Sequence, residues 1–355
     1  MLGLRIKQAR IAAGLSLRGL AKASDNYISA QVLQKYERGI TNPGSDVLIK
    51  LAKALGVKVE YFFRPAAVQV SLDCPVYRKR ASIPKKYLES IHAKVKDKVE
   101  KYLEIETLFP EDRFDRISIS KLKHRNIHKA GDIEKLAEDL RDAWALGNDP
   151  IENMTDIIED RGAMVISMEA NDDFDGLSCW ANDMIPVIVV KEGLSGDRQR
   201  SDLAHELGHL IMKVSSGDAK YEEKAAKRFS GAFLAPADAV YRELGKKRHN
   251  LDLSELVLLK KKYGMSMQQW IYRAKDLGII SESRAVEWFK LFRIKKWYRK
   301  EPVDVNPEEP KRYKLLVIQA VTEGIISPLR AAEFLDIPYD KFRKDVIAEL
   351  EENHS

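Results

Sequence analysis

Few cysteines, no long apolar run and no low-complexity segment characterise this sequence of 355 residues. Cys74 and Cys179 are too few for a disulfide framework, which favours a reducing compartment. The longest apolar run, residues 184–190, is far shorter than the roughly 20 residues that a membrane helix needs. The N-terminus also lacks the basic and then apolar layout of a secretion signal. We therefore expect a cytoplasmic protein with no membrane partner.

The composition is that of a globular protein, 45% hydrophobic and 32% charged, and the length allows more than one domain. The net charge of +6 is unevenly distributed along the chain. Residues 1–65 hold 11 basic and 4 acidic side chains, a net charge of +7, whereas residues 150–245 hold 10 and 18, a net charge of −8. Residues 246–355 hold 22 and 17, a net charge of +5. The basic N-terminal segment predicts a nucleic-acid partner.

The most informative stretch is residues 201–212, which contain the pattern H-E-x-x-H at His205, Glu206 and His209. Positions i and i+4 of a helix lie on one face, so the two imidazoles would point at the same spot. Two neutral imidazoles at that spacing can hold a zinc ion. Glu206 lies about 100° round the helix and could act as general base on a metal-bound water.

A five-residue pattern with two free positions also arises by chance, and two histidines can lie on a helix surface without a role. The background argues against chance, because apolar residues recur at helical spacing through the stretch: Leu203, Leu207, Leu210 and Ile211. Such a helix is expected to be buried, and buried polar side chains need partners. We therefore favour the metal site.

A second helix, expected at residues 222–236, offers a third ligand. Glu223, Ala226 and Ser230 share one face of it, and the small side chains would let it approach the H-E-x-x-H helix closely. Two histidines and one glutamate with an open fourth position are typical of catalytic zinc. Glu222 is the alternative ligand, and either glutamate could instead be a solvated acid of the first turn.

Residues 1–65 are expected to form a run of short helices. Ser16 and Ser29 are suited to cap the second and third helices, and Gly39 to end the third. The motifs resemble the helix-turn-helix domain of the Cro/CI-like (XRE-type) repressors over essentially the whole segment. The resemblance rests on four stretches of the sequence: Ser16–Lys22, Ser29–Gly39, Asn42-Pro43 and Leu48–Val57.

The resemblance implies that the third helix enters the major groove of operator DNA, where Ala30, Gln31, Gln34 and Lys35 would face base edges or phosphates. The alternative is an ordinary solvated helix face. The connection between the second and third helices is about two residues longer than the commonest form of this motif. Two-fold operators also lead us to expect a homodimer.

A connector is expected at residues 66–125, with a long helix from Pro84 to about Leu108. Its apolar stripe could pair with a second copy, but packing within the chain is favoured, because three sustained heptads are absent. Strand-like segments follow at residues 163–168, 177–180 and 185–190.

The region around the H-E-x-x-H pattern resembles the ImmA/IrrE family of zinc metallopeptidases. The resemblance rests on 174–180, 186–190, 196–200, 205–209 and 223–236, with Ser230 and Ala235 as small departures from the usual residues. It implies that His205, His209 and Glu223 are the zinc ligands and that Glu206 is the catalytic glutamate.

We expect a multidomain, mainly α protein with four parts: an all-α helix-turn-helix bundle (1–65), the connector (66–125), an α+β zincin-like core with a small sheet (126–245) and a helical C-terminal domain (246–355). A second helix-turn-helix-like unit could lie at 327–350, in contact with DNA, another domain or the substrate.

The implied function is a DNA-binding regulator whose zinc endopeptidase cleaves a repressor protein, so that stress, phage or mobile-element genes are derepressed. The alternative is a regulator or antitoxin-like repressor whose zinc fold is a sensor or scaffold. A purely structural zinc is a third interpretation.

Overall fold

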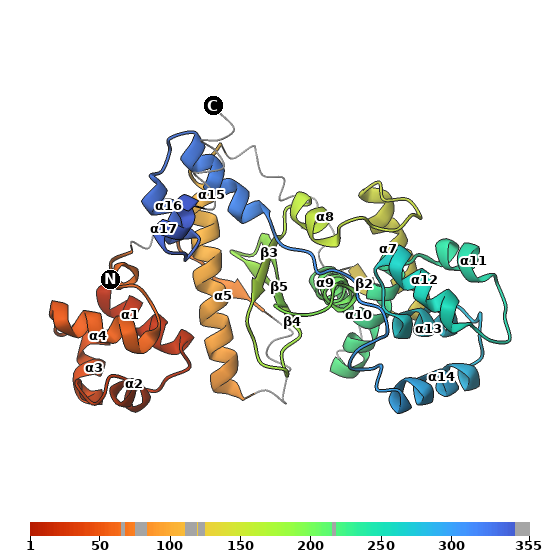
Figure 1. Ribbon diagram of the computed structural model, residues 1–355, viewed down its shortest axis with the longest axis horizontal. Coiled ribbons are helices and arrows are strands. Elements are labelled where there is room, and N and C mark those ends of the chain that lie inside the picture. The colour runs from red at the N-terminus through yellow and green to blue at the C-terminus, as the bar shows by residue number, and fades with distance from the viewer. Residues whose placement is uncertain (65–67, 75–83, 111–118, 120–124, 215–217, 345–355) are drawn as a thin grey trace. The chain divides into compact units, whose positions relative to one another are not determined.

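The computed structural model describes residues 1–64, 68–74, 84–110, 119, 125–214 and 218–344 (Figure 1). The fold is mainly helical with a small mixed sheet, as the sequence predicted. The chain forms two compact units. The first comprises residues 1–72, 80–111 and 314–355, and the second comprises residues 73–79 and 112–313.

The first unit is helical throughout its described part. Its elements are α1 (Leu2–Ala12), α2 (Leu17–Ala23), α3 (Ala30–Glu37), α4 (Ser45–Leu55), the 3₁₀ helix η1 (Val59–Phe63), α5 (Lys85–Glu106), α15 (Arg312–Thr322, which begins at the boundary), α16 (Pro328–Phe334) and α17 (Tyr339–Phe342). Ser16 and Ser29 cap α2 and α3 as predicted, each accepting a hydrogen bond from a backbone N–H three residues on. Residues from α1 to η1 share one core, which includes Ile6, Leu20 and Leu51.

The long helix α5 packs against α1 within this unit. Arg5 on α1 is 4% exposed, and its Nη1 lies 2.7 Å from Oε2 of Glu100 on α5. Arg64, after η1, pairs with Asp97 at 2.8 Å. Buried charges need partners, and α5 supplies them here. The apolar stripe of α5 is also buried within the chain, since Val95 and Val99 are 0% exposed.

The second unit combines strands and helices. Its elements are β1 (Leu72–Asp73, at the boundary), β2 (Arg125–Ile127), α7 (Ala130–Ala143), α8 (Met154–Asp160), β3 (Met164–Met168), β4 (Gly176–Ala181), β5 (Ile185–Lys191), α9 (Gly196–Ile211), β6 (Met212–Val214), α10 (Ala219–Leu234), α11 (Ala237–Leu244), α12 (Leu253–Tyr263), α13 (Met267–Asp276) and α14 (Glu282–Ile294). The main sheet has the order β1-β4-β5-β3. Strand β5 pairs antiparallel with β4 and parallel with β3, while β2 and β6 form a separate parallel pair.

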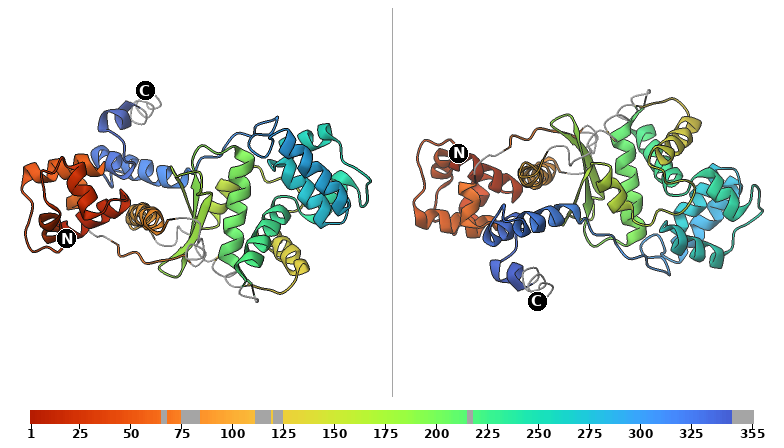
Figure 2. Two further views of the ribbon diagram at one scale, coloured as in Figure 1. Left: turned by 90° about the horizontal axis from the view of Figure 1, so that it is seen from below. Right: turned by 90° about the horizontal axis from the view of Figure 1, so that it is seen from above.

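Helix α9 packs against β4 and β5, and α10 packs against α9 (Figure 2). Gly208 permits the close approach of the two helices, since a Cβ there would lie 2.9 Å from the Phe229 ring of α10. Ala225, Ala226 and Gly231 on α10 are likewise small and buried. The residues that carry the predicted site therefore lie on two tightly packed helices.

A chain segment that we call the strap, residues 301–312, completes the second unit. Glu301 accepts hydrogen bonds from the backbone N–H groups of Met267 (3.0 Å) and Gln268 (3.1 Å), the first two residues of α13. Its carboxylate also pairs with the buried Lys260 at 2.8 Å. An acid at this position satisfies free N–H groups and interacts favourably with the helix dipole.

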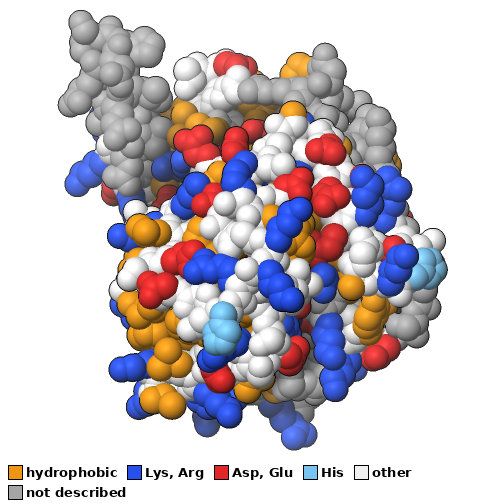
Figure 3. Space-filling view, turned by 90° about the vertical axis from the view of Figure 1, so that its right-hand side faces the viewer, with side chains coloured by type: hydrophobic (Ala, Val, Ile, Leu, Met, Phe, Trp, Pro, Cys, Tyr) orange, Lys and Arg blue, Asp and Glu red, His pale blue; other side chains and the backbone are white. Residues whose placement is uncertain are grey.

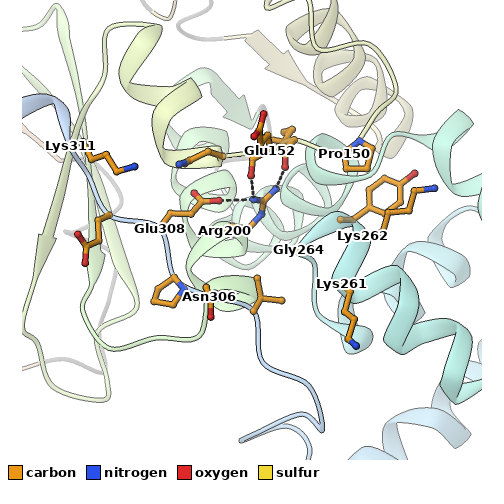
Figure 4. Close-up of a pocket in the computed structure, with 15 residues that line it drawn as sticks. Pro150, Glu152, Arg200, Lys261, Lys262, Gly264, Asn306, Glu308 and Lys311 are labelled. Carbon is orange, nitrogen blue, oxygen red and sulfur yellow. Dashed lines mark hydrogen bonds and ion pairs between the residues drawn. The ribbon is translucent and has the colours of Figure 1, made fainter.

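Glu308 of the strap does the same for α8. It accepts hydrogen bonds from the backbone N–H groups of Met154 (3.1 Å) and Thr155 (2.8 Å) and pairs with Arg200 of α9 at 2.6 Å. Figure 4 shows Arg200 between Glu308 and the backbone of residues 151 and 152, whose carbonyls also accept from it. The first turns of α8 and α13 are thus capped by residues that lie more than thirty positions after the N–H groups they bind.

No helix in the described part of the chain is long and apolar enough to cross a membrane. On the face seen in Figure 3, basic and acidic side chains are interspersed. That mixture is typical of an ordinary solvated surface.

Candidate metal centre and nucleic-acid interface

The two histidines of the H-E-x-x-H pattern come together on α9. Their Nε2 atoms lie 3.0 Å apart, and the rings meet edge to face. The side chain of His209 is 1% exposed and that of His205 is 14% exposed. Leu203 and Leu207 hold the opposite side of the helix in the core. The i, i+4 spacing therefore places both imidazoles at one point, as predicted from the sequence.

Helix α10 brings Glu223 to the same point. Its Oε1 lies 3.3 Å from Nε2 of His209, and its Oε2 lies 3.4 Å from Nε2 of His205. One ligand atom from each of the three residues lies within 4.8 Å of the others. Glu222, the alternative, is not in this group, which is the one potential metal-binding group found among the described residues.

The electrostatics of the group favour a cation at its centre. Hydrogen bonds from His205 and His209 hold the pKa of the Glu223 carboxyl far below its usual range. Burial acts to lower the pKa of His209, but the hydrogen bond to Glu223 and the charge of Glu206 outweigh it and raise that pKa. A divalent ion can take the place of the protons that this arrangement attracts.

The donor set fits zinc. Two imidazole nitrogens and a carboxylate oxygen lie close together, and this is the donor set that protein chains supply to catalytic zinc, whose fourth ligand is a water or a substrate. Nδ1 of His209 is buried and has no hydrogen bond with any part of the chain that the structure describes.

Glu206 lies beside the ligands and outside their group. It is 2% exposed, and its Oε2 accepts a hydrogen bond of 2.7 Å from Oγ of Ser178 on β4. Gly176, two residues earlier on the strand, allows the contact, since a Cβ there would lie 3.1 Å from Oε1 of Glu206. Alternate residues of a strand face the same side, so Gly176 and Ser178 form one seat for this carboxylate.

The sequence did not predict this contact of Glu206 with Gly176 and Ser178. The strand around residues 177–180 was expected, but nothing in the sequence alone pairs Ser178 with a residue 28 positions later. The signal was a glycine and a serine two apart in an otherwise apolar strand.

Cys179 lies within β4 and Cys74 directly follows β1, and neither belongs to the ligand group. Both are buried, and the hydrogen bond with Cys74 and burial raise the pKa of the Cys179 thiol well above its usual value. A thiol in that state is a poor nucleophile and a poor metal ligand.

The predicted DNA-contacting residues all lie on α3, between its first residue and its last turn. Gln31, Gln34 and Lys35 are exposed, Ala30 is half-buried, and Leu33 on the opposite side is fully buried. The six residues 24–29 connect α2 and α3, which agrees with the expected lengthening of the turn.

A helix-turn-helix bundle and an α+β unit with an H-E-x-x-H helix define the class: a DNA-binding domain fused to a metallopeptidase-type domain. Comparison with family models gives the same two parts. Residues 6–62 match the helix-turn-helix family, and residues 158–275 match the family described as IrrE N-terminal-like domain. The N-terminal part of the chain is thus similar to XRE-type helix-turn-helix domains, and a later part is similar to IrrE/ImmA-like domains. No curated protein gives a significant match to the chain.

A cavity of about 560 Å³ lies elsewhere on the second unit, lined by residues 150–153, 261–264, 305–309, Arg200 and Lys311 (Figure 4). None of the three ligand residues, nor Glu206, lines it. Its lining is polar and its charges are mixed, and it plays no part in the proposed chemistry.

Proposed function

We propose that this protein is a DNA-binding regulator that carries a zinc-dependent endopeptidase and cleaves a repressor protein, derepressing stress, phage or mobile-element genes. The observation that carries the proposal is the convergence of His205, His209 and Glu223. Glu206, which comes from the same helix as the two histidines, is buried and is not part of this group. The helix-turn-helix domain supports operator binding, with Gln31 and Gln34 suited to base edges.

The residues have distinct roles in this mechanism. His205, His209 and Glu223 would hold zinc, which when bound supplies a Lewis acid that activates water and polarises a carbonyl. Glu206 accepts the proton from the attacking water and returns it to the leaving amine. Ser178 donates a hydrogen bond to Oε2 of Glu206 and so helps to position this carboxylate.

A repressor bound to DNA is the substrate we favour, because the fused helix-turn-helix domain would concentrate the peptidase at a promoter. A tethered domain acts at a raised effective concentration without any new contact. A peptidase brought to its substrate in this way needs little affinity of its own.

The test uses the purified full chain loaded with zinc and repressors encoded near its gene. Mass spectrometry should detect two fragments of one repressor, and a chelator should prevent their formation. Glu206→Gln should retain zinc and DNA binding but lose cleavage, because it cannot accept the proton.

Two results would contradict the proposal. If Glu206→Gln cleaved the repressor at the wild-type rate, Glu206 could not be the general base. A chain that binds zinc and regulates a reporter equally well with and without Glu206 would instead be the sensor or scaffold.

A further inference from the structure

The last described helices repeat the local structure of the N-terminal helix-turn-helix. Helices α2 and α16 are both 7 residues long. Each follows a serine whose Oγ accepts a backbone hydrogen bond, Ser16 from Gly19 (3.0 Å) and Ser327 from Arg330 (3.2 Å). The preceding helix ends in both cases at a glycine with positive φ, which is 66° and 70° for the two glycines.

The two helices also end alike. Asp25 and Asp336, at equivalent positions, both have a φ of 56°. In each case the next residue donates its N–H to the carbonyl of a buried alanine five positions earlier, Ala21 at 2.9 Å and Ala332 at 3.1 Å. The left-handed aspartate and this hydrogen bond thus end both helices in the same way.

The turn after α16 is the more regular of the two. Four residues, 335–338, connect α16 and α17, whereas six connect α2 and α3. Helix-turn-helix motifs have a turn of about 3–4 residues. Leu33 and Phe342 stand three positions after the first residue of each second helix, and both are fully buried.

We propose that α15, α16 and α17 form a second DNA-binding helix-turn-helix, which presents α17 to the major groove of double-stranded DNA. Counted from the start of the helix, Arg343 and Lys344 occupy the positions that Gln34 and Lys35 occupy on α3. Arg343, Lys344 and the neighbouring Lys341 are all exposed.

The charges around this motif are arranged in favour of DNA. Asp336 of the turn pairs with Lys101 of α5 at 2.5 Å, and Glu333 pairs with Arg330 at 2.6 Å. By contrast, none of the three basic residues on and after α17 forms an ion pair with a described residue, and Asp340 is the acid within α17 itself. Exposed basic side chains on the second helix of such a motif are suited to phosphates and guanine.

Side-chain contacts hold α16 and the turn after it in place. Arg330 also contacts Glu104 of α5 at 2.5 Å, and Lys58 donates to the carbonyl of Ile337 at 3.1 Å. These contacts belong to the same compact unit as the first helix-turn-helix. One unit would then read two DNA segments.

The test uses the full chain and a mixed-sequence duplex of about 40 base pairs, long enough for two such motifs. Binding is measured by fluorescence anisotropy over a range of salt concentrations. A triple alanine variant of α17 is compared with a control of equal charge loss on the exposed side of α14. The α17 variant is Lys341→Ala/Arg343→Ala/Lys344→Ala, and the control is Lys290→Ala/Arg293→Ala/Lys295→Ala.

Loss of three phosphate contacts should reduce the slope of log K against log salt by about 2.7, and affinity at low salt should fall at least about tenfold. The control should keep both quantities. On genomic fragments enriched by the wild-type chain, hydroxyl-radical footprints should shrink at one end only. Circular dichroism checks that each variant is folded, and the single change Lys344→Glu should weaken binding in the same direction.

Wild-type affinity, slope and footprint in the folded α17 variant would overturn the proposal. So would a variant that keeps DNA binding but loses a protein partner, because α17 would then be a protein-docking surface.

Discussion

Ser178→Ala tests how the proposed general base is held. The substitution removes the hydroxyl that lies 2.7 Å from Oε2 of Glu206, while the strand and both ligand helices are untouched. Glu206 is 2% exposed, so water cannot readily replace the lost donor. We expect the carboxylate to sample other orientations and to be offered less often to the attacking water.

The magnitude follows from the kind of hydrogen bond. A buried bond to a charged group contributes about 1.5–3 kcal/mol. Each 1.4 kcal/mol corresponds to about a tenfold change in rate. If most of this energy orients Glu206 in the transition state, kcat should fall about 10- to 100-fold. KM should change little, because Ser178 is fully buried and does not reach the substrate.

The assay compares kcat, KM and zinc content with those of Ser230→Ala. Ser230 is also buried, and its hydroxyl donates to the carbonyl of Ser201 at 2.9 Å, at the α9–α10 contact and outside the ligand group. That control should lose stability but keep kcat. Unchanged kcat in Ser178→Ala, or an equal fall in both variants, would refute the positioning role.

Three further predictions concern the metal, the helix contact and pH. Glu223→Gln should weaken zinc binding at least about tenfold in a competition with a chromophoric chelator, whereas Glu222→Gln should not; equal effects would contradict the ligand assignment. Gly208→Ala, which forces α9 from α10, should lower the free energy of unfolding by about 1–3 kcal/mol, while Gly131→Ala, which meets nothing within 4 Å, should not reduce it. Burial raises the pKa of Glu159 from 4.5 to about 7, so between these pH values the native state binds a proton that the unfolded state has lost. As pH rises from 4.5 to 7, the wild type should therefore lose stability relative to Glu159→Gln, by roughly 3 kcal/mol at most. An equal change in the melting temperature of both proteins across that range would show the shift to be absent.

The convergence of the three candidate metal ligands could be predicted from the sequence because helix periodicity is local. His205 and His209 need only the i, i+4 rule, and Glu223 needs only the small residues that let α10 approach. The serine caps of α2 and α3 are local as well. The mainly helical fold with a small sheet follows from the same periodicities.

The remaining features depend on contacts between distant residues. Helix α8 begins at Met154, whose N–H donates to Glu308, a residue 154 positions away. Neither the cap nor the pairing of Ser178 with Glu206 leaves a periodic signal.

The strap, residues 301–312, also determines how short a fragment of the second unit can be. The family match stops at residue 275, before Glu301 and Glu308. A fragment that ended there would lose one of the two carboxylates that pair with the buried Lys260, the ion-pair partner of Arg200, and the acceptors that Glu301 and Glu308 supply to the first turns of α13 and α8. The family match thus underestimates the length of polypeptide that this domain needs in order to fold on its own.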